Sequence, residues 1–117
     1  MASLTSVQEL RHPDMADPTV LIRIADRLRS EMNAERIVLY GSVARGDATI
    51  DSDIDLLVVA DTNDKAYLRM ARARAVIRDL SNGLSVSRLV LIPGELHDAR
   101  MRGDSFIEEI EQTGYEV

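Results

Sequence analysis

The chain has 117 residues, a formal net charge of −6 and 45% hydrophobic residues, with no cysteine. This length fits one domain with a workable core, and the acidic balance argues against nucleic acid as a direct ligand, because nucleic-acid binders need a basic face to displace counterions. The absence of cysteine excludes disulfides, thiolate nucleophiles and zinc–thiolate sites.

No apolar run approaches the roughly 20 residues that span a bilayer, and the first residues lack a signal-peptide pattern. We therefore expect a soluble, cytoplasmic protein without a membrane partner. Residues 1–16 are expected to be loosely structured, and residues 17–117 to form the single domain.

The first predicted helix covers about residues 18–33. Asp17 suits the N-cap, and Pro18 suits the first helical position. The apolar residues that follow recur at helical spacing, which predicts one buried stripe. They are Leu21, Ile24, Ala25, Leu28 and Met32.

Two strands and a short helix are predicted next. Residues 36–40, "RIVLY", are apolar and β-branched, as in a buried strand. Residues 42–45 can then form a short helix that Gly46 ends. Residues 53–60, "DIDLLVVA", are apolar on both faces after an acidic start, which is typical of a strand in the middle of a covered sheet.

The second half of the chain continues the alternation of helices and strands. A helix is predicted over 64–80, with Asn82-Gly83 at its end and an apolar stripe of Ala66, Met70, Ala73, Ile77 and Leu80. The remaining predicted elements are a strand over 85–92, helical pieces over 95–101 and 105–112, and an extended end over 115–117. This order predicts an α/β fold with a small mixed β-sheet and helices packed on it.

The stretch "YGSVARGDATIDSDIDLLVV", residues 40–59, carries the candidate site. Ser42 falls where a strand becomes a helix, and free backbone N–H groups at such a point favour a phosphate. Gly41 allows a close approach of the backbone. Asp53 and Asp55 follow at the start of the next strand, where residues i and i+2 point to one face.

Two ionised carboxylates side by side repel each other unless a divalent cation lies between them. Mg²⁺ typically binds one or two carboxylates together with substrate phosphates. The stretch therefore predicts a site for a Mg²⁺-chelated nucleoside triphosphate, with Ser42 on the phosphates and Asp53 and Asp55 on the metal. The alternative interpretation is that the Gly, Ser and Asp residues of this stretch only form turns. Against it, burying the charge of Asp55 inside an apolar strand costs several kcal/mol unless the charge is paired.

These residues also resemble a known family. "GS", ten residues and "DID" are similar to the nucleotidyltransferase motif of the DNA polymerase β-like superfamily, and "GSVARGDATIDSDIDLLV" resembles the minimal nucleotidyltransferase (MNT) proteins of prokaryotes. The resemblance implies a polymerase β-like fold. It implies that Gly41, Ser42 and Arg45 lie on the nucleotide side and that Asp53 and Asp55 are the catalytic metal ligands for Mg²⁺.

The resemblance implies transfer of a nucleoside monophosphate, from ATP or another triphosphate, to a hydroxyl group. MNT proteins commonly pair with a HEPN-domain toxin as its antitoxin, and some adenylylate a tyrosine of that partner. Two other interpretations stay open. One is a degenerate module that only binds nucleotide or partner. The other is a transferase acting on a small molecule such as an aminoglycoside, which the short chain argues against.

One position departs from the family pattern. The family usually carries a third carboxylate on the strand predicted at 85–92, and Ser87 stands at that position. A serine holds a metal poorly and is a poor base. Glu95 or Asp98 could reach in from the following segment.

Other polar residues give weaker signals. His12 and His97 lack partners at ligand spacing and fit surface positions better than a metal site. The face formed by Arg69, Arg72 and Arg78 is expected to be a charged helix surface, with a partner-binding face as the alternative.

Overall fold

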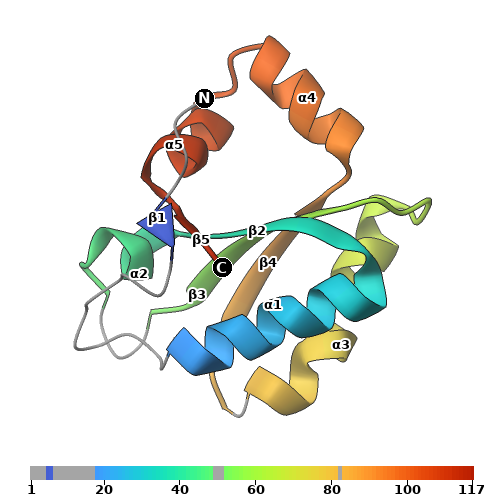
Figure 1. The fold of residues 1–117 in the computed structure, drawn as a ribbon. Coiled ribbons are helices and arrows are strands. Elements are labelled where there is room, and N and C mark those ends of the chain that lie inside the picture. Colours follow the sequence, from blue (N-terminus) through green and yellow to red (C-terminus); the bar gives the residue numbers. More distant parts are fainter. Residues whose placement is uncertain (1–4, 7–17, 49–51, 82) are drawn as a thin grey trace.

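The computed structural model describes residues 5–6, 18–48, 52–81 and 83–117, and Figure 1 shows their arrangement. The strands are β1 (Thr5–Ser6), β2 (Ala34–Tyr40), β3 (Ile54–Ala60), β4 (Val86–Leu91) and β5 (Tyr115–Glu116). The helices are α1 (Pro18–Met32), α2 (Gly41–Arg45), α3 (Ala66–Ser81), α4 (Pro93–Met101) and α5 (Ser105–Thr113).

The strands form one mixed sheet in the order β1-β5-β2-β3-β4. β2 is antiparallel to both β3 and β5, whereas β4 is parallel to β3 and β1 is parallel to β5. The predicted α/β class and mixed sheet are confirmed. β3 lies between β2 and β4, and its residues are buried in cores on both faces of the sheet, which explains why its sequence is apolar on both faces.

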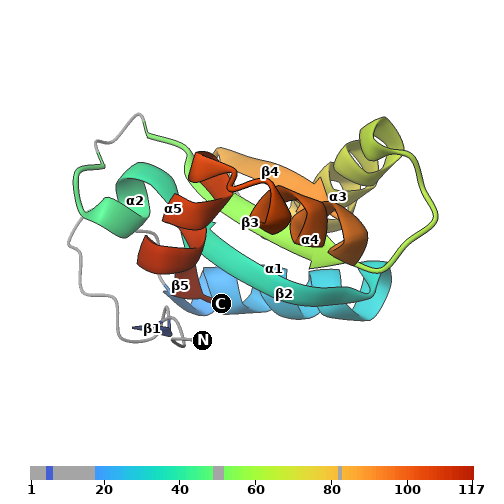
Figure 2. The same cartoon turned by 90° about the horizontal axis from the view of Figure 1, so that it is seen from above.

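Helices cover both faces of the sheet (Figures 1 and 2). Helices α1 and α3 pack on one face, over a core that includes Ile37, Leu39, Leu56, Val58 and Val90. Helices α4 and α5 lie on the other face, where Leu96 and Ile107 from these helices pack with Val38, Leu57 and Val59 from the sheet. Successive strand residues alternate between the two cores, as the pleat of a strand requires.

The stripe predicted for α1 is confirmed, because all five of its members are buried. The stripe predicted for α3 is only partly right. Ala73 and Ile77 are buried, whereas Ala66 is exposed. Arg69 is buried instead, with 4% of its surface exposed, and its guanidinium pairs with Glu95 at 2.8 Å. A nearby carboxylate makes burial of this charge tolerable, so Arg69 does not belong to an open basic face.

The N-terminal segment differs in part from the expectation of loose structure, since Thr5–Ser6 forms strand β1 beside β5. The rest of residues 1–16 lies outside the described residues, as do Asp17, Asp51 and Asn82. Among the helices that the structure describes, none has both the length and the hydrophobicity needed to cross a membrane.

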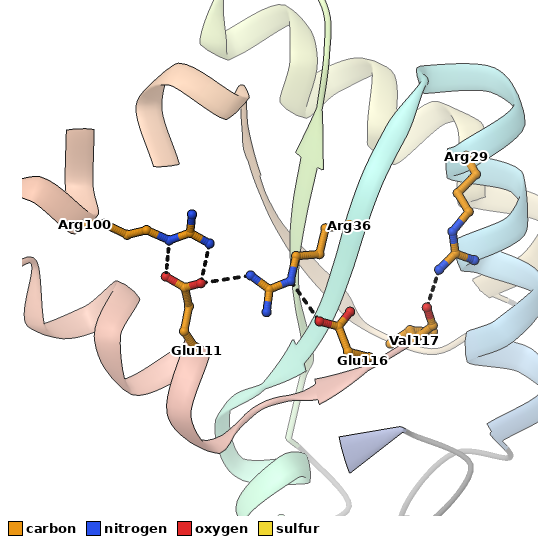
Figure 3. Close-up of polar contacts among 6 residues, drawn as sticks. All are labelled: Arg29, Arg36, Arg100, Glu111, Glu116 and Val117. Atoms are coloured by element: carbon orange, nitrogen blue, oxygen red, sulfur yellow. Dashed lines mark hydrogen bonds and ion pairs between the residues drawn. The ribbon is translucent and has the colours of Figure 1, made fainter. Parts of the chain in front are cut away.

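A network of arginines and carboxylates attaches the C-terminal segment to the rest of the domain (Figure 3). Arg36 on β2 donates to Glu111 on α5 at 2.9 Å and to Glu116 on β5 at 2.8 Å. Arg100 on α4 forms two hydrogen bonds to the Glu111 carboxylate, at 2.7 and 2.5 Å. Arg29 on α1 donates to the carbonyl of Val117. These contacts hold α5 in place over the sheet.

Candidate functional site

The strand-to-helix corner at Gly41 packs directly against Asp55. Gly41 has a φ of +80°, in the left-handed region that favours glycine. A Cβ at this position would overlap Asp55 Oδ2 and lie 3.1 Å from Asp55 Cγ. Glycine is therefore required here for its backbone conformation and for space. The contact places the first turn of α2, which carries Ser42, beside the carboxylate of β3.

Asp55 lies in a row of three residues that crosses the sheet. Its register partners are Tyr40 on β2 and Ser87 on β4. Residues in register across neighbouring strands point to the same face. This is the face of Leu57 and Val59, on the side of α4 and α5. Asp53 immediately precedes β3, which begins at Ile54 and not at residue 53 as predicted, and it is near enough for its charge to act on Asp55.

The charges near Asp55 show which groups the fold brings together. The pKa of Asp55 is raised above its usual value by burial and, second, by the negative charge of Asp53, while Arg45 opposes the shift. Arg45 lies at the last position of α2 and pairs with Asp47 at 3.3 Å. Of the predicted site residues, Gly41, Arg45 and Asp53 are thus placed around Asp55, with Ser42 following Gly41.

Ser87 stands beside Asp55, as the alignment of the third strand requires, and its side chain is exposed. Among the described residues, no three Asp, Glu, His or Cys side chains are grouped so that they could hold a metal. The position next to Asp55 on β4 therefore carries a hydroxyl and not a carboxylate.

Among the described residues, neither Glu95 nor Asp98 is grouped with Asp53 and Asp55 in a set that could hold a metal, so the structure does not support either as the third acid. β3 and β4 are parallel, so α4 begins beyond the end of the sheet opposite to Asp55. β4 ends at Leu91, four residues after Ser87, which is about 13 Å along the strand, and α4 begins only after that point. Glu95 instead accepts hydrogen bonds from Arg69 at 2.8 Å and from the backbone N–H of Ile92 at 3.0 Å. Its role is to neutralise Arg69 and to close the first turn of α4.

The comparison with protein families decides the family. The model of the nucleotidyltransferase domain family matches residues 21–114, which include the corner at Gly41 and the pair Asp53 and Asp55. The chain belongs to this nucleotidyltransferase family. This assignment fits the polymerase β-like superfamily that the motif resembles, and the family implies a nucleoside triphosphate as substrate.

Two relatives of the chain come from Methanocaldococcus jannaschii, and both are named "Putative protein adenylyltransferase". One is 30% identical over 83 residues, which cover 71% of this chain and 78% of the relative. The other is 55% identical over 29 residues, covering 25% of this chain and 29% of the relative. A crystal structure of "a putative nucleotidyltransferase" from Sulfolobus solfataricus has a TM-score of 0.53 and 22% identity, covering 84% of this chain and 76% of that one. The structural likeness supports the nucleotidyltransferase fold.

Nucleotidyltransferases normally use a divalent metal ion, and the donor set near Asp55 fits one. Asp53 and Asp55 are hard oxygen donors close enough for the charge of one to raise the pKa of the other. A divalent cation between them would remove this repulsion. Two protein carboxylates are enough for Mg²⁺ when substrate phosphates supply further oxygens.

One residue beside the site was not predicted from the sequence. Phe106 on α5 packs edge to face against the ring of Tyr40, with ring centroids 5.6 Å apart. Tyr40 is half-buried, and burial and the charge of Asp55 raise the pKa of its hydroxyl. The aromatic pair forms a wall next to Asp55. Phe106 is the chain's one phenylalanine, but nothing in its local sequence indicates a neighbour 66 positions earlier.

Proposed function

We propose that this chain binds Mg-ATP at the corner of β2 and α2 and transfers the adenylyl group to a hydroxyl of a partner protein. Gly41, Ser42 and Arg45 would bind the nucleotide, and Asp53 and Asp55 would hold the metal and serve the catalytic centre. The observation that carries the proposal is the packing of Gly41 against Asp55, which joins the phosphate-side corner to the carboxylates. The names of the two archaeal relatives support adenylylation of protein.

The proposed reaction exchanges one phosphorus–oxygen bond for another. The acceptor hydroxyl oxygen bonds to the α-phosphorus, the bond from that phosphorus to the β-phosphate breaks, and pyrophosphate leaves while the hydroxyl proton passes to solvent. A bound Mg²⁺ would neutralise phosphate oxygens as negative charge develops. The chain's own part is to position the triphosphate against Asp53 and Asp55, with the Arg45 guanidinium near enough to act on the charge of Asp55.

We further propose that the partner is a HEPN-domain toxin and that this chain is its antitoxin. The support is the likeness of residues 41–57 to MNT proteins. The test is co-expression with a HEPN-domain protein encoded next to the chain's gene, incubation with labelled ATP and Mg²⁺, and mass spectrometry of both chains. We expect one or more adenylyl groups on the partner. Lack of such a neighbouring gene would contradict the antitoxin role and leave the nucleotide site to be tested by itself.

A second candidate is a module that binds nucleotide or partner without turnover. The observation that favours it is the register of Asp55 with Ser87, which leaves a hydroxyl where the family has its third acid. Under this proposal the chain binds Mg-ATP and the partner, but neither chain gains an adenylyl group. The same mass spectrometry, combined with calorimetry of Mg-ATP binding, separates the two candidates.

A further inference from the structure

A pocket lies on the sheet face that α1 and α3 cover, between α3 and the start of β4. Its volume is about 440 Å³, and its lining includes Arg74 and Arg78 from α3 and Arg88 from β4. Arg74 and Arg78 are four residues apart and therefore share one side of the helix. Arg88 follows Ser87 directly, so its side chain leaves β4 on the face opposite to that of Asp55. The pocket therefore lies on the face opposite to Asp55, at the same end of the sheet, where the Ile54 N–H donates to the carbonyl of Ser85.

The arginines of this pocket differ from most others in the chain. Of the twelve arginines that the structure describes, eight have a carboxylate oxygen within 4.0 Å. The other four are Arg23, Arg74, Arg78 and Arg88, and three of these line the one pocket. No described residue of the lining is acidic. Acids outnumber bases by 20 to 14 in the chain, so a shortage of carboxylates does not explain the gathering.

Arg88 shows that the cluster is incompletely satisfied. Its Nε is buried and has no hydrogen-bond partner among the described residues, while one terminal nitrogen donates to the carbonyl of Val86 at 2.5 Å. The pKa of Arg88 is lowered, first by burial and then by the charge of Arg74. A buried donor without a partner and two like charges in proximity both cost free energy. An anion in the pocket would relieve both.

We propose that this pocket binds a phosphate-bearing anion, with Arg74, Arg78 and Arg88 as its ligands. The planar guanidinium group presents paired donors that match two oxygens of a phosphate, and three such groups suit a di- or triphosphate better than a single charge. The carbonyl end of α3 lies nearby and opposes an anion, so affinity depends on the three charges together. The proposal uses neither Asp53 nor Asp55 and is independent of the proposed function.

The test is calorimetric titration of the full chain with inorganic pyrophosphate in the presence of EDTA, which removes metal-dependent binding. We expect the double variant Arg74→Gln/Arg88→Gln to bind about tenfold more weakly, or not at all. Arg23→Gln is the matched control, because Arg23 is also without an ion pair among the described residues but lies outside the pocket. This control should bind within about twofold of the wild type. No binding by the wild type at millimolar pyrophosphate, or equal binding by the arginine variant, would overturn the proposal.

Thermal unfolding gives a second readout for a variant that folds poorly. Pyrophosphate should raise the Tm of the wild type and leave that of Arg78→Gln nearly unchanged, and Arg78 is exposed enough for this variant to fold. Arg88→Met should raise the Tm without ligand, because it removes the unpaired Nε and the repulsion from Arg74. Citrate that protects as well as pyrophosphate would show a general carboxylate or anion pocket and contradict the phosphate assignment.

Discussion

The Asp55 carboxylate lies against the backbone of Gly41, so closely that a side chain of any size on residue 41 would overlap it. One contact thereby joins the first residue of α2 to the start of β3. It also ties the position of the proposed metal ligand to the conformation of the proposed phosphate corner. A change at either residue should therefore alter both stability and nucleotide binding.

Gly41→Ala tests this coupling. The left-handed φ of +80° and the overlap with Asp55 should together cost roughly 1–3 kcal/mol of unfolding free energy and weaken Mg-ATP binding strongly. Gly83→Ala is the matched control, because Gly83 has a φ of +85° but nothing within 4 Å of its Cβ position. Urea unfolding and calorimetry would measure both effects. If both variants lost the same unfolding free energy and Gly41→Ala kept its affinity for Mg-ATP, the overlap of the new Cβ with Asp55 would affect neither stability nor binding.

Replacing both acids tests the metal site. Asp53→Asn with Asp55→Asn removes the carboxylate donors. It also removes the charge of Asp53 that, after burial, raises the pKa of Asp55. We expect Mg-ATP binding to disappear in calorimetry, while the Tm stays the same or rises slightly. Asp61→Asn is the control, since Asp61 is an exposed acid just beyond the other end of β3. Unchanged Mg-ATP affinity in the double variant would refute the assignment.

Ser87→Asp tests whether the missing acid limits turnover. The register with Asp55 places the new carboxylate on the same face, where it should raise the rate of adenylyl transfer when ATP, Mg²⁺ and the acceptor are present. The added charge should also lower the Tm until Mg²⁺ is supplied. Ser87→Asn is the uncharged control and should not gain activity. Rapid adenylyl transfer by the wild type, with the same rate in Ser87→Ala, would show that another residue supplies the role of the third acid.

Glu95→Ala separates the structural role of Glu95 from a catalytic one. Loss of its carboxylate leaves the buried Arg69 without its ion pair, so the variant should lose roughly 1–3 kcal/mol of stability. Mg-ATP affinity at a temperature where the variant is folded should not change. Asp98→Ala, an exposed acid on the same helix, should affect neither quantity. A selective loss of nucleotide transfer in a stable Glu95→Ala protein would restore Glu95 as a site residue.

Glu111 should make the stability depend on pH. Its pKa lies below the usual value, chiefly because Arg100 donates to it, with a further contribution from Arg36. The ionised carboxylate therefore stabilises the fold above the pKa of the unfolded chain, and this contribution is lost as the pH falls through the lower pKa of the folded state. Glu111→Gln should lose roughly 1–3 kcal/mol of unfolding free energy at neutral pH. Its unfolding free energy should also change less than that of the wild type as the pH falls.

The control for that measurement is Glu109→Gln on the same helix, an exposed acid outside the network of Figure 3. Its unfolding free energy should follow the wild type from neutral to acidic pH. Parallel curves for the wild type and Glu111→Gln would mean that the Arg36–Glu111–Arg100 network adds no net stability.

Local patterns along the chain were enough to predict the main elements and the mixed α/β class. The spacing of Leu21, Leu28 and Met32 reports one face of α1, because helical neighbours lie three and four residues apart. The continuous apolar run of β3 and the turn chemistry of Gly46 are equally local. The pair Asp53 and Asp55 could be assigned to one face for the same reason, since a strand repeats every two residues.

Only the tertiary structure decided which distant residues meet. The register of β3 with β4 placed Ser87 beside Asp55 and sent Glu95 to the opposite end of the sheet, where it pairs with Arg69. The packing of α3 on β4 gathered three arginines into one pocket. Such contacts depend on how whole elements dock through their apolar faces, and no repeat within a single helix or strand encodes the partner it will face.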